Sequence, residues 1–338
     1  MEFIELAELC DKGSSNLAQK DLVFDSGIYP VYGAPGEITK VDFFHQSKPY
    51  LGLIKDGAGV GRVMQLPANS SVIGTIQYIF PKENVDLKYL YYLIKYLDLG
   101  KSNTGATIPH IYFKDYKKRK VKVREYGEQK HIGQILELID SHLSAYKKVL
   151  EQYDLLIKSR FVELFGDVVL NTLNWPLVKL SAIAEYRIGL TYKPEAVSSS
   201  GIAVLRSGNI QNSQLCYEDT IYVNSKVDSK LLLKKNDILM CARNGSQSLV
   251  GKVALIENDI SNTTYGAFMM AISSKYYVYL FEYFRSQAFR RLISVGSTTT
   301  INQVTTRMLN SIVIPLPELD TINRFALYHS QINKLKFA

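Results

Sequence analysis

The amino-acid sequence follows one plan twice, and this duplication limits the folds that the chain can adopt. Residues 4–165 and 178–338 contain the same landmarks in the same order, from a short apolar strand pattern to a helix pattern. Matched landmarks such as Gly61 and Gly251 lie about 190 positions apart, whereas the repeats of a solenoid run to roughly 50 residues. The duplication therefore predicts two copies of a whole domain, each followed by a helix.

The landmarks shared by the two copies combine glycine with basic, apolar or hydroxyl residues. They are Gly61-Arg62-Val63 and Gly251-Lys252-Val253, 74–79 and 266–272, the tyrosine-rich helix patterns at 89–97 and 277–289, and Gly105 to Thr107 with Gly296 to Thr300. Runs of apolar residues bounded by turn residues predict strands between these landmarks. The mixture of strands and helices predicts an α+β fold class, with two tandem globular domains.

The most regular stretch is a helix pattern between the copies, from Glu128 to Phe165. Apolar residues recur there in steps of three and four, which is the seam of a heptad repeat. The seam residues are Leu136, Ile139, Leu143, Tyr146, Leu150, Tyr153 and Ile157. Gly166 follows, at the position that glycine favours after a helix. At ~1.5 Å per residue this helix would be on the order of 57 Å long, which indicates a spacer.

A second and shorter helix is predicted from Glu318 onward, with Ile322, Phe325 and Ile332 on one side. We expect the two long helices to pair as an antiparallel coiled coil. The alternative is that each packs only on its own domain, but the seam outlasts a typical surface helix. The expected boundaries are a first globular domain at 1–127, the spacer helix at 128–166, a second globular domain at 167–317 and the C-terminal helix at 318–338.

The cysteines, the N-terminus and the apolar runs indicate the cellular compartment in which the chain is expected to function. The three cysteines are an odd number without CxxC spacing, which argues against a disulfide framework and a zinc site. The N-terminus lacks the charged segment of a signal peptide, and no apolar run approaches the ~18 residues of a membrane span. We therefore expect a soluble, cytoplasmic protein.

Positive charge is concentrated outside the predicted spacer helix. The net charge is +8, and residues 114–124 carry seven lysines or arginines against one acid. The spacer helix has five basic and six acidic residues. Domains that bind nucleic-acid phosphates have this distribution. Lysines that blunt an exposed strand edge explain residues 117–120 equally well.

Polar and basic residues in glycine-rich loops at equivalent places are the candidates for contacts to DNA. Asn and Gln can read adenine and Arg can read guanine, while hydroxyl groups hold phosphates. In the first copy the candidates are Tyr32, Lys55, Arg62, Thr107 and His110, and in the second they are Arg206, Asn209, Arg243, Asn244, Lys252, Thr300, Asn302 and Gln303. For about half of them, a role in stabilising turns is the competing interpretation.

The sequence lacks the motifs of the common enzyme classes. It contains no GxxxxGK[ST], HExxH or GxSxG motif and no clustered cysteines. It also lacks the Asn-Pro-Pro-Tyr signature of adenine methyltransferases. We therefore expect a chain without catalytic activity, bound cofactor or metal.

The duplicated order of motifs resembles the DNA specificity subunits of type I restriction-modification systems. The resemblance covers nearly the whole chain and depends on residues 29–36, on the Gly-Ala-Thr and Gly-Ser-Thr-Thr-Thr loops, on 314–318 and on 161–166. The first copy departs from the family pattern with Val121-Lys122-Val123-Arg124 where Pro-Leu-Pro is usual.

The resemblance implies that each globular domain is a target recognition domain for one half of a bipartite double-stranded DNA sequence. It also implies, as partners, two methyltransferase subunits, which modify adenine with S-adenosylmethionine, and a restriction-translocase subunit that uses ATP. Two other functions stay open at this point: a fragment of a fused methyltransferase-nuclease enzyme, and a coiled-coil scaffold that does not bind DNA.

If the spacer helix sets the distance between the half-sites, lengthening it should lengthen the target. Inserting one heptad after Leu150 preserves the seam and adds ~10.5 Å. DNA rises ~3.4 Å per base pair, so the gap between unchanged half-sites should grow by up to about three base pairs. Mapping methylated adenines after co-expression with the methyltransferase measures this gap. Methylation at the original spacing would contradict the spacer role.

Overall fold

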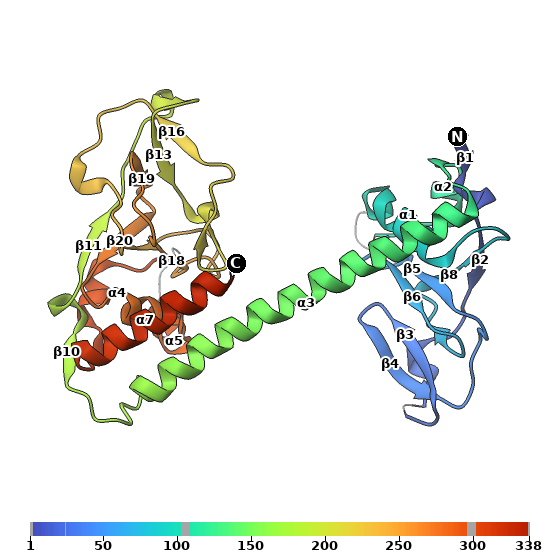
Figure 1. The fold of residues 1–338 in the computed structure, drawn as a ribbon, viewed down its shortest axis with the longest axis horizontal. Coiled ribbons are helices and arrows are strands. Elements are labelled where there is room, and N and C mark those ends of the chain that lie inside the picture. Colours follow the sequence, from blue (N-terminus) through green and yellow to red (C-terminus); the bar gives the residue numbers. More distant parts are fainter. Residues whose placement is uncertain (1–2, 24, 103–108, 296–301, 337–338) are drawn as a thin grey trace. The chain divides into compact units, whose positions relative to one another are not determined.

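The computed structural model describes residues 3–23, 25–102, 109–295 and 302–336. The chain divides into two compact units, unit 1 (Met1–Lys147) and unit 2 (Lys148–Ala338). Each unit combines small β-sheets with helices (Figure 1), which confirms the predicted α+β class with tandem globular domains. The boundary between the units falls inside helix α3 (Tyr126–Phe165), so each unit contains one end of this helix.

Unit 1 is built around a four-stranded antiparallel sheet in its described residues. The sheet order is β2 (Cys10–Ser14), β8 (Ile76–Pro81), β5 (Tyr50–Ile54) and β6 (Val63–Leu66). A second sheet has the order β4 (Gly36–Val41), β3 (Tyr29–Gly33) and β7 (Ser71–Val72), and β1 (Phe3–Glu5) pairs with β9 (Lys120–Lys122). The α-helices among the described residues of this unit before α3 are α1 (Leu87–Leu97) and α2 (Phe113–Tyr116).

Strand β5 is buried on both faces. Its Leu51 and Leu53 share a hydrophobic core with Leu90 and Ile94 of α1, whereas Tyr50 belongs to a separate core cluster with residues of β7 and β8. Successive side chains of a strand point to opposite faces, so the apolar run of β5 supplies two cores at once.

Local side-chain chemistry fixes the ends of α1. The Asp86 carboxylate accepts a hydrogen bond from the Tyr89 backbone N–H at 2.9 Å, which caps the first turn. Asp98 ends the helix with φ +44°, in the left-handed region. This short polar residue tolerates that conformation better than bulky residues do.

Unit 2 repeats this architecture and adds short elements. Its main sheet has the order β11 (Glu185–Ile188), β20 (Met269–Ser273), β17 (Ile238–Cys241) and β18 (Val253–Leu255). A second sheet has the order β12 (Val197–Ser198), β16 (Ile221–Val223), β13 (Ile202–Leu205) and β19 (Thr263–Tyr265). The remaining pairs are β14 (Ile210–Gln211) with β15 (Gln214–Leu215) and β10 (Leu177–Lys179) with β21 (Val313–Pro315). Besides the end of α3, the described α-helices of this unit are α4 (Tyr277–Arg285), α5 (Gln287–Val295), α6 (Thr306–Ser311) and α7 (Leu319–Lys336).

The two units share their strand pairings. In both, the third strand of the main sheet is buried along its whole length, β5 in unit 1 and β17 in unit 2. The second sheets each contain one parallel pair, β3 with β7 and β13 with β19. Each unit also closes with an antiparallel pair between its first and last strands. The duplication in the sequence is therefore a duplication of topology.

In unit 1, the first part of α3 is attached mainly through polar contacts. Gln129 is 2% exposed, and its amide bonds to the Arg124 carbonyl at 2.9 Å and to the Asp86 N–H at 3.0 Å. A side chain on Gly133 would meet α1 atoms at about 3.0 Å, which explains a glycine inside this helix. Ion pairs from α1 to Glu137 and Asp140 extend the contact.

In unit 2, the last part of α3 lies in the main hydrophobic core. The rings of Phe161 and Phe165 lie 5.6 and 5.3 Å from that of Phe325 on α7. At the other end of α7, Lys336 forms an ion pair with Asp154 at 2.8 Å. The start of α7 thus meets the end of α3, and the two helices pair in antiparallel orientation (Figure 1).

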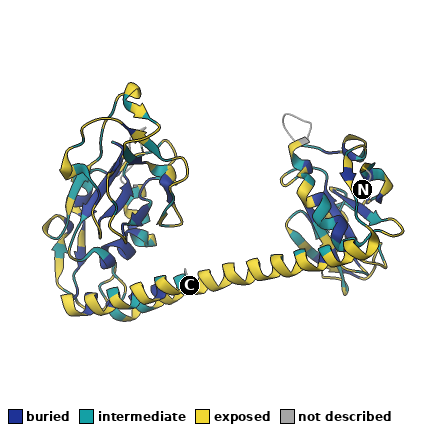
Figure 2. Cartoon of the chain, turned by 45° about the horizontal axis from the view of Figure 1, so that its top comes forward, coloured by how far each residue is buried: buried dark blue, intermediate teal, exposed yellow. Residues whose placement is uncertain are grey.

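The predicted extent of this pairing is wrong for the first part of the seam. Ile139, Leu143, Tyr146 and Leu150 are 48%, 53%, 68% and 40% exposed, and the middle of α3 is exposed throughout (Figure 2). The reason is geometric: α7 starts beside Phe165, and its described residues reach only as far as Asp154. Leu136 and Tyr153 are half-buried, and the buried members of the predicted set are Ile157, Ile322, Phe325 and Ile332.

A buried ionic cluster lies where α4 faces α7. The Glu282 carboxylate is 2.6 Å from Arg285 Nη1 and 3.5 Å from His329 Nε2, and Glu282 is only 5% exposed. Burial alone would raise the pKa of Glu282, but the bond from His329 and the charge of Arg285 outweigh it and hold that pKa below its ordinary value of 4.5. Glu282 is therefore ionised at neutral pH and stabilises the pairing of α4 with α7.

Truncating Phe325 should selectively unfold unit 2. Phe325→Ala removes a fully buried ring, and such changes cost about 3–5 kcal/mol. Trp175 is the single tryptophan of the chain and belongs to unit 2, so its fluorescence in urea reports the unfolding of this unit. Leu327→Ala on the same helix, at a side chain 64% exposed, is the matched control. Equal losses in the two variants would contradict the role of the Phe325 contact.

Neutralising Glu282 should change how stability depends on pH. Because its pKa is depressed on folding, the contribution of Glu282 is fully present above pH 4.5 and is lost as pH falls through the folded-state pKa. Glu282→Gln should therefore cost about 3–5 kcal/mol near pH 7, and this difference from the wild type should shrink below pH 4.5. Thermal unfolding between pH 3 and 7 measures it, with the exposed Glu185→Gln as control. A difference independent of pH would refute the ionic role.

Candidate nucleic-acid interface

The matched strands β5 and β17 are each followed by a loop, and an equivalent backbone hydrogen bond closes the two loops. The Gly61 N–H donates to the Ile54 carbonyl at 2.8 Å, and the Gly251 N–H donates to the Cys241 carbonyl at 2.8 Å. Both glycines have positive φ, +85° and +77°, in the region that favours glycine. These bonds make Ile54 the structural equivalent of Cys241.

An isolated β-bridge follows at the same place in each loop. It joins Asp56 to His110 in unit 1 and Arg243 to Gln303 in unit 2. Asp56 and Arg243 each stand two residues after the equivalent strand ends, so they are equivalent to each other, as His110 is to Gln303. Each bridge thereby joins residues that are far apart in the sequence, and His110, Arg243 and Gln303 among them are predicted candidates.

In unit 1 the loop residues form a small polar cluster. His110 Nδ1 lies 2.8 Å from Asp56 Oδ1, and Lys55 Nζ lies 3.5 Å from Asp56 Oδ2. The ring of His110 stacks on Tyr112 with centroids 6.3 Å apart. The cluster presents donors and one carboxylate acceptor at a partly exposed surface. The sequence did not indicate Asp56 or Tyr112, although each stands next to or near a candidate residue.

The other described candidates of unit 1 are Arg62 and Tyr32. Arg62 is exposed, and its guanidinium donates to the Ala34 carbonyl in the turn between β3 and β4. Tyr32 is half-buried in β3. Burial raises the pKa of its phenol, with a smaller contribution from the Glu37 charge, so the hydroxyl stays protonated and can donate.

In unit 2 three separate loops are joined into one platform. The Asn244 side-chain amide donates to Ser207 Oγ at 3.1 Å, and its backbone N–H donates to the Asn302 carbonyl at 3.3 Å. The Asn302 side chain donates in turn to the Gly245 carbonyl at 3.3 Å. These bonds connect the loops that follow β13 and β17 with the segment before α6.

Arg243, Phe268 and Gln303 are among the exposed residues at this platform. The Arg243 guanidinium lies over the Phe268 ring, 5.3 Å from its centroid. The Phe268 ring is 59% exposed. The sequence indicated Arg243 and Gln303 but not Phe268, which reads as one residue of the apolar run that becomes β20.

The structure does not support the prediction that Asn209 contacts DNA. It is 2% exposed, and its amide donates to the Cys216 and Glu218 carbonyls at 2.9 and 3.2 Å. Its Oδ1 accepts from the Arg206 backbone N–H at 2.8 Å. A side chain so engaged stabilises the loop and is not available to DNA. Arg206 itself is exposed and donates to the Asp219 carbonyl at 3.3 Å.

The remaining candidates are Lys252, Thr107 and Thr300. Lys252 is half-buried directly before β18, and its carbonyl accepts from the Cys241 N–H at 2.8 Å. Thr107 and Thr300 lie outside the described residues, and the glycine-rich loops that contain them lie outside as well.

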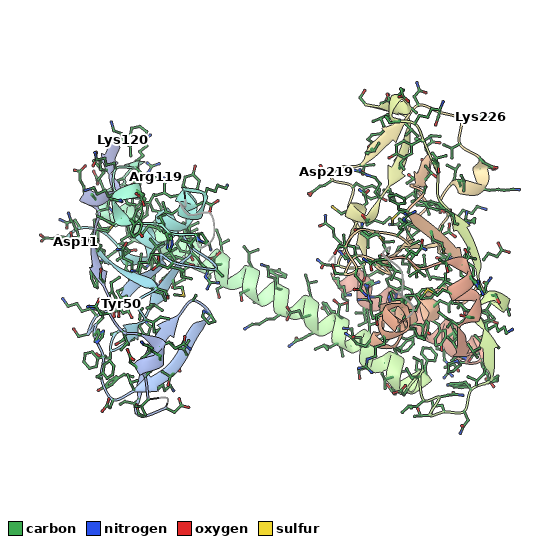
Figure 3. All side chains as sticks on the ribbon, turned by 180° about the vertical axis from the view of Figure 1, so that it is seen from behind. Asp11, Tyr50, Arg119, Lys120, Asp219 and Lys226 are labelled. Atoms are coloured by element: carbon green, nitrogen blue, oxygen red, sulfur yellow. The ribbon has the colours of Figure 1, made fainter. Side chains whose placement is uncertain are left out.

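The basic segment of unit 1 has both structural and exposed members. Arg119 donates to the Leu97 carbonyl at 3.0 Å, so it connects the end of α1 to the segment that precedes β9. Lys120 and Lys122 are exposed on β9, which pairs with β1. Figure 3 shows Arg119 and Lys120 on this segment. The lysines fit a phosphate contact and a protected strand edge equally well.

Within the ranges that the structure describes, no group of three or more His, Cys, Asp or Glu side chains is arranged to hold a metal ion. In the same ranges, no helix is long and apolar enough to cross a membrane.

Comparison with known proteins identifies the family. A family model described as type I restriction modification DNA specificity domain matches residues 1–152 and again 173–331. The chain belongs to this family. It is a DNA specificity subunit, whose role is to recognise sequence and not to catalyse a reaction.

Individual relatives agree with this membership. The chain is 22% identical over 295 residues to the type I restriction enzyme MjaVIII specificity subunit of Methanocaldococcus jannaschii, covering 79% of this chain and 68% of that protein. It is 26% identical over 155 residues to the StySPI specificity subunit of Salmonella potsdam, covering 43% of this chain and 33% of that protein.

A solved structure supports the fold alone. The crystal structure of a type I restriction-modification S subunit from M. genitalium aligns over 99% of this chain and 91% of that one, with a TM-score of 0.63 and 17% sequence identity.

Proposed function

We propose that units 1 and 2 each read one half of a bipartite double-stranded DNA target. The main support for this proposal is that the polar cluster of unit 1 and the loop platform of unit 2 are equivalent. We call both of them loop platforms, and they are built on the bridges Asp56–His110 and Arg243–Gln303. Both present hydrogen-bonding side chains at the surface, and the two sets differ in chemistry. Two platforms of equal architecture and different side chains suit two half-sites of different sequence.

The proposal keeps the domain boundaries that the sequence predicts. Residues 1–127 and 167–317 are the two target recognition domains, and residues 128–166 are the spacer between them. The net charge of +8 favours binding to the phosphate backbone, so affinity for any duplex should fall steeply with salt.

We further propose that the chain assembles in the cytoplasm with two methyltransferase subunits and a restriction-translocase subunit. The duplicated topology supports two equivalent docking positions for the methyltransferase. In such a complex the partners supply the chemistry on adenine, and this chain chooses where it takes place.

The loop that contains Asn302 and Gln303 should determine only one half of the target. Changing both residues to Ala removes two amide side chains of unit 2, each able to read adenine by paired hydrogen bonds. Loss of a base-reading contact costs about 1–3 kcal/mol at one position. We expect the methylated motif to relax in one half-site and to stay unchanged in the other. Sequencing methylated adenines in cells that co-express the methyltransferase reads out both halves.

His110→Ala is the matched control, because His110 is the equivalent of Gln303 in unit 1. It should relax the opposite half-site. If the double variant leaves the motif untouched, this loop does not read bases. If the two variants relax the same half-site, the assignment of one half-site to each unit is wrong.

A further inference from the structure

Phe268 stands out among the exposed aromatic residues of unit 2 because it lies on the loop platform. It comes between β19 and β20, directly before the first residue of β20. Isolated exposed apolar residues are common on protein surfaces. Here, however, the ring lies under the guanidinium of Arg243, beside the loops that bind one another through Asn244.

The backbone fixes the positions from which Arg243 and Phe268 project. The Arg243 N–H donates to the Phe268 carbonyl at 3.0 Å, and the Ala242 N–H donates to the same oxygen at 2.9 Å. Arg243 also forms the bridge to Gln303. These bonds fix the backbone positions of both residues, and the contact with the Phe268 ring then restricts the guanidinium before any ligand binds.

The chemistry of this pair points to a particular base. A guanidinium stacked on an aromatic ring keeps its planar edge of N–H donors free to form two parallel hydrogen bonds. In the DNA major groove the matching pair of acceptors is O6 and N7 of guanine. An exposed phenyl ring next to it can contact a thymine methyl group or a base face.

We propose that Arg243 reads a guanine in the half-site bound by unit 2, and that Phe268 is a specificity residue that orients Arg243 and contacts the neighbouring base. This inference deepens the proposed function and depends on it. Phe268 acts in two ways: its ring restricts the guanidinium, and its exposed face excludes water from the contact.

The equivalent place in unit 1 carries different chemistry, which supports the assignment. Asp56 stands where unit 2 has Arg243, and Lys55 donates its backbone N–H to Thr75, whose carbonyl occupies the place of that of Phe268. A carboxylate accepts hydrogen bonds and cannot bind the two acceptors of guanine, whereas it can accept from the cytosine amino group. The position of unit 1 that is equivalent to Arg243 therefore cannot make the guanine contact that we assign to Arg243.

The test is selection of randomised 40-base-pair duplex DNA by the purified full chain, followed by sequencing of the bound fraction. The wild-type chain should enrich a bipartite motif with a guanine in one half. Arg243→Ala and Arg243→Lys should both reduce the preference for that guanine by roughly 5- to 150-fold, with the other half of the motif unchanged. Phe268→Ala should weaken the same guanine and the base next to it.

Control variants separate base reading from loss of charge or fold. Lys226→Ala removes one exposed positive charge from unit 2 outside the platform and should leave the motif unchanged. Phe268→Leu keeps an apolar side chain and should restore folding if Phe268→Ala unfolds, as Trp175 fluorescence reports. It should still lose preference for the guanine, because the stacked ring is absent.

Two results would overturn the inference while leaving DNA recognition intact. One is a wild-type motif that Arg243→Lys retains in full, since a phosphate contact needs only a positive charge. The other is a uniform loss of binding in the Arg243 variants with no change of motif. Failure of the wild-type chain to enrich any motif would instead refute the proposed function, and this inference with it.

Discussion

The aromatic contact between the end of α3 and α7 is the interaction on which the organisation of unit 2 depends. Phe161 and Phe165 meet Phe325 and Tyr279, with ring centroids 5.0 to 5.6 Å apart. Burying such rings is strongly favourable because each removes a large apolar area from water. Since Tyr279 belongs to α4, the same contact joins both long helices to the domain core.

The two ends of α3 are attached to their units by different kinds of interaction. In unit 1 the attachment is polar and specific, through the buried amide of Gln129 and the ion pairs of Glu137 and Asp140. In unit 2 it is chiefly apolar, with Asp154 and Lys336 closing the edge of the contact. Hydrogen bonds fix a helix in register and direction, while apolar burial supplies most of the free energy. Each unit therefore contains an anchored segment of one continuous helix.

The loop platforms combine a constant frame with variable side chains. The glycines Gly61 and Gly251 and the backbone bridges beside them are common to both units. The side chains on that frame differ, an acid with a histidine in unit 1 and an arginine with a glutamine in unit 2. Backbone bonds do not depend on side-chain identity, so such a frame accommodates changes in the residues that face a ligand.

Much of the candidate site could be predicted from the sequence, because loops of polar residues between apolar runs are local patterns. Arg243, Gln303, Lys55 and His110 were found in this way, and the structure places them in two equivalent clusters. Asp56 and Phe268 were missed because their roles depend on contacts with distant residues. The bond between His110 and Asp56, for example, spans 54 positions.

The sequence by itself determined the duplication, the α+β class, the long helix and its end at Gly166, since these depend on periodicity and on conformational preferences of single residues. Only the tertiary structure decided which part of the seam is covered. Periodicity marks Leu143 and Ile157 alike, yet one is 53% exposed and the other fully buried. It also decided that Asn209 stabilises a loop. Burial and hydrogen-bond partners arise when distant segments meet, and no local pattern contains that information.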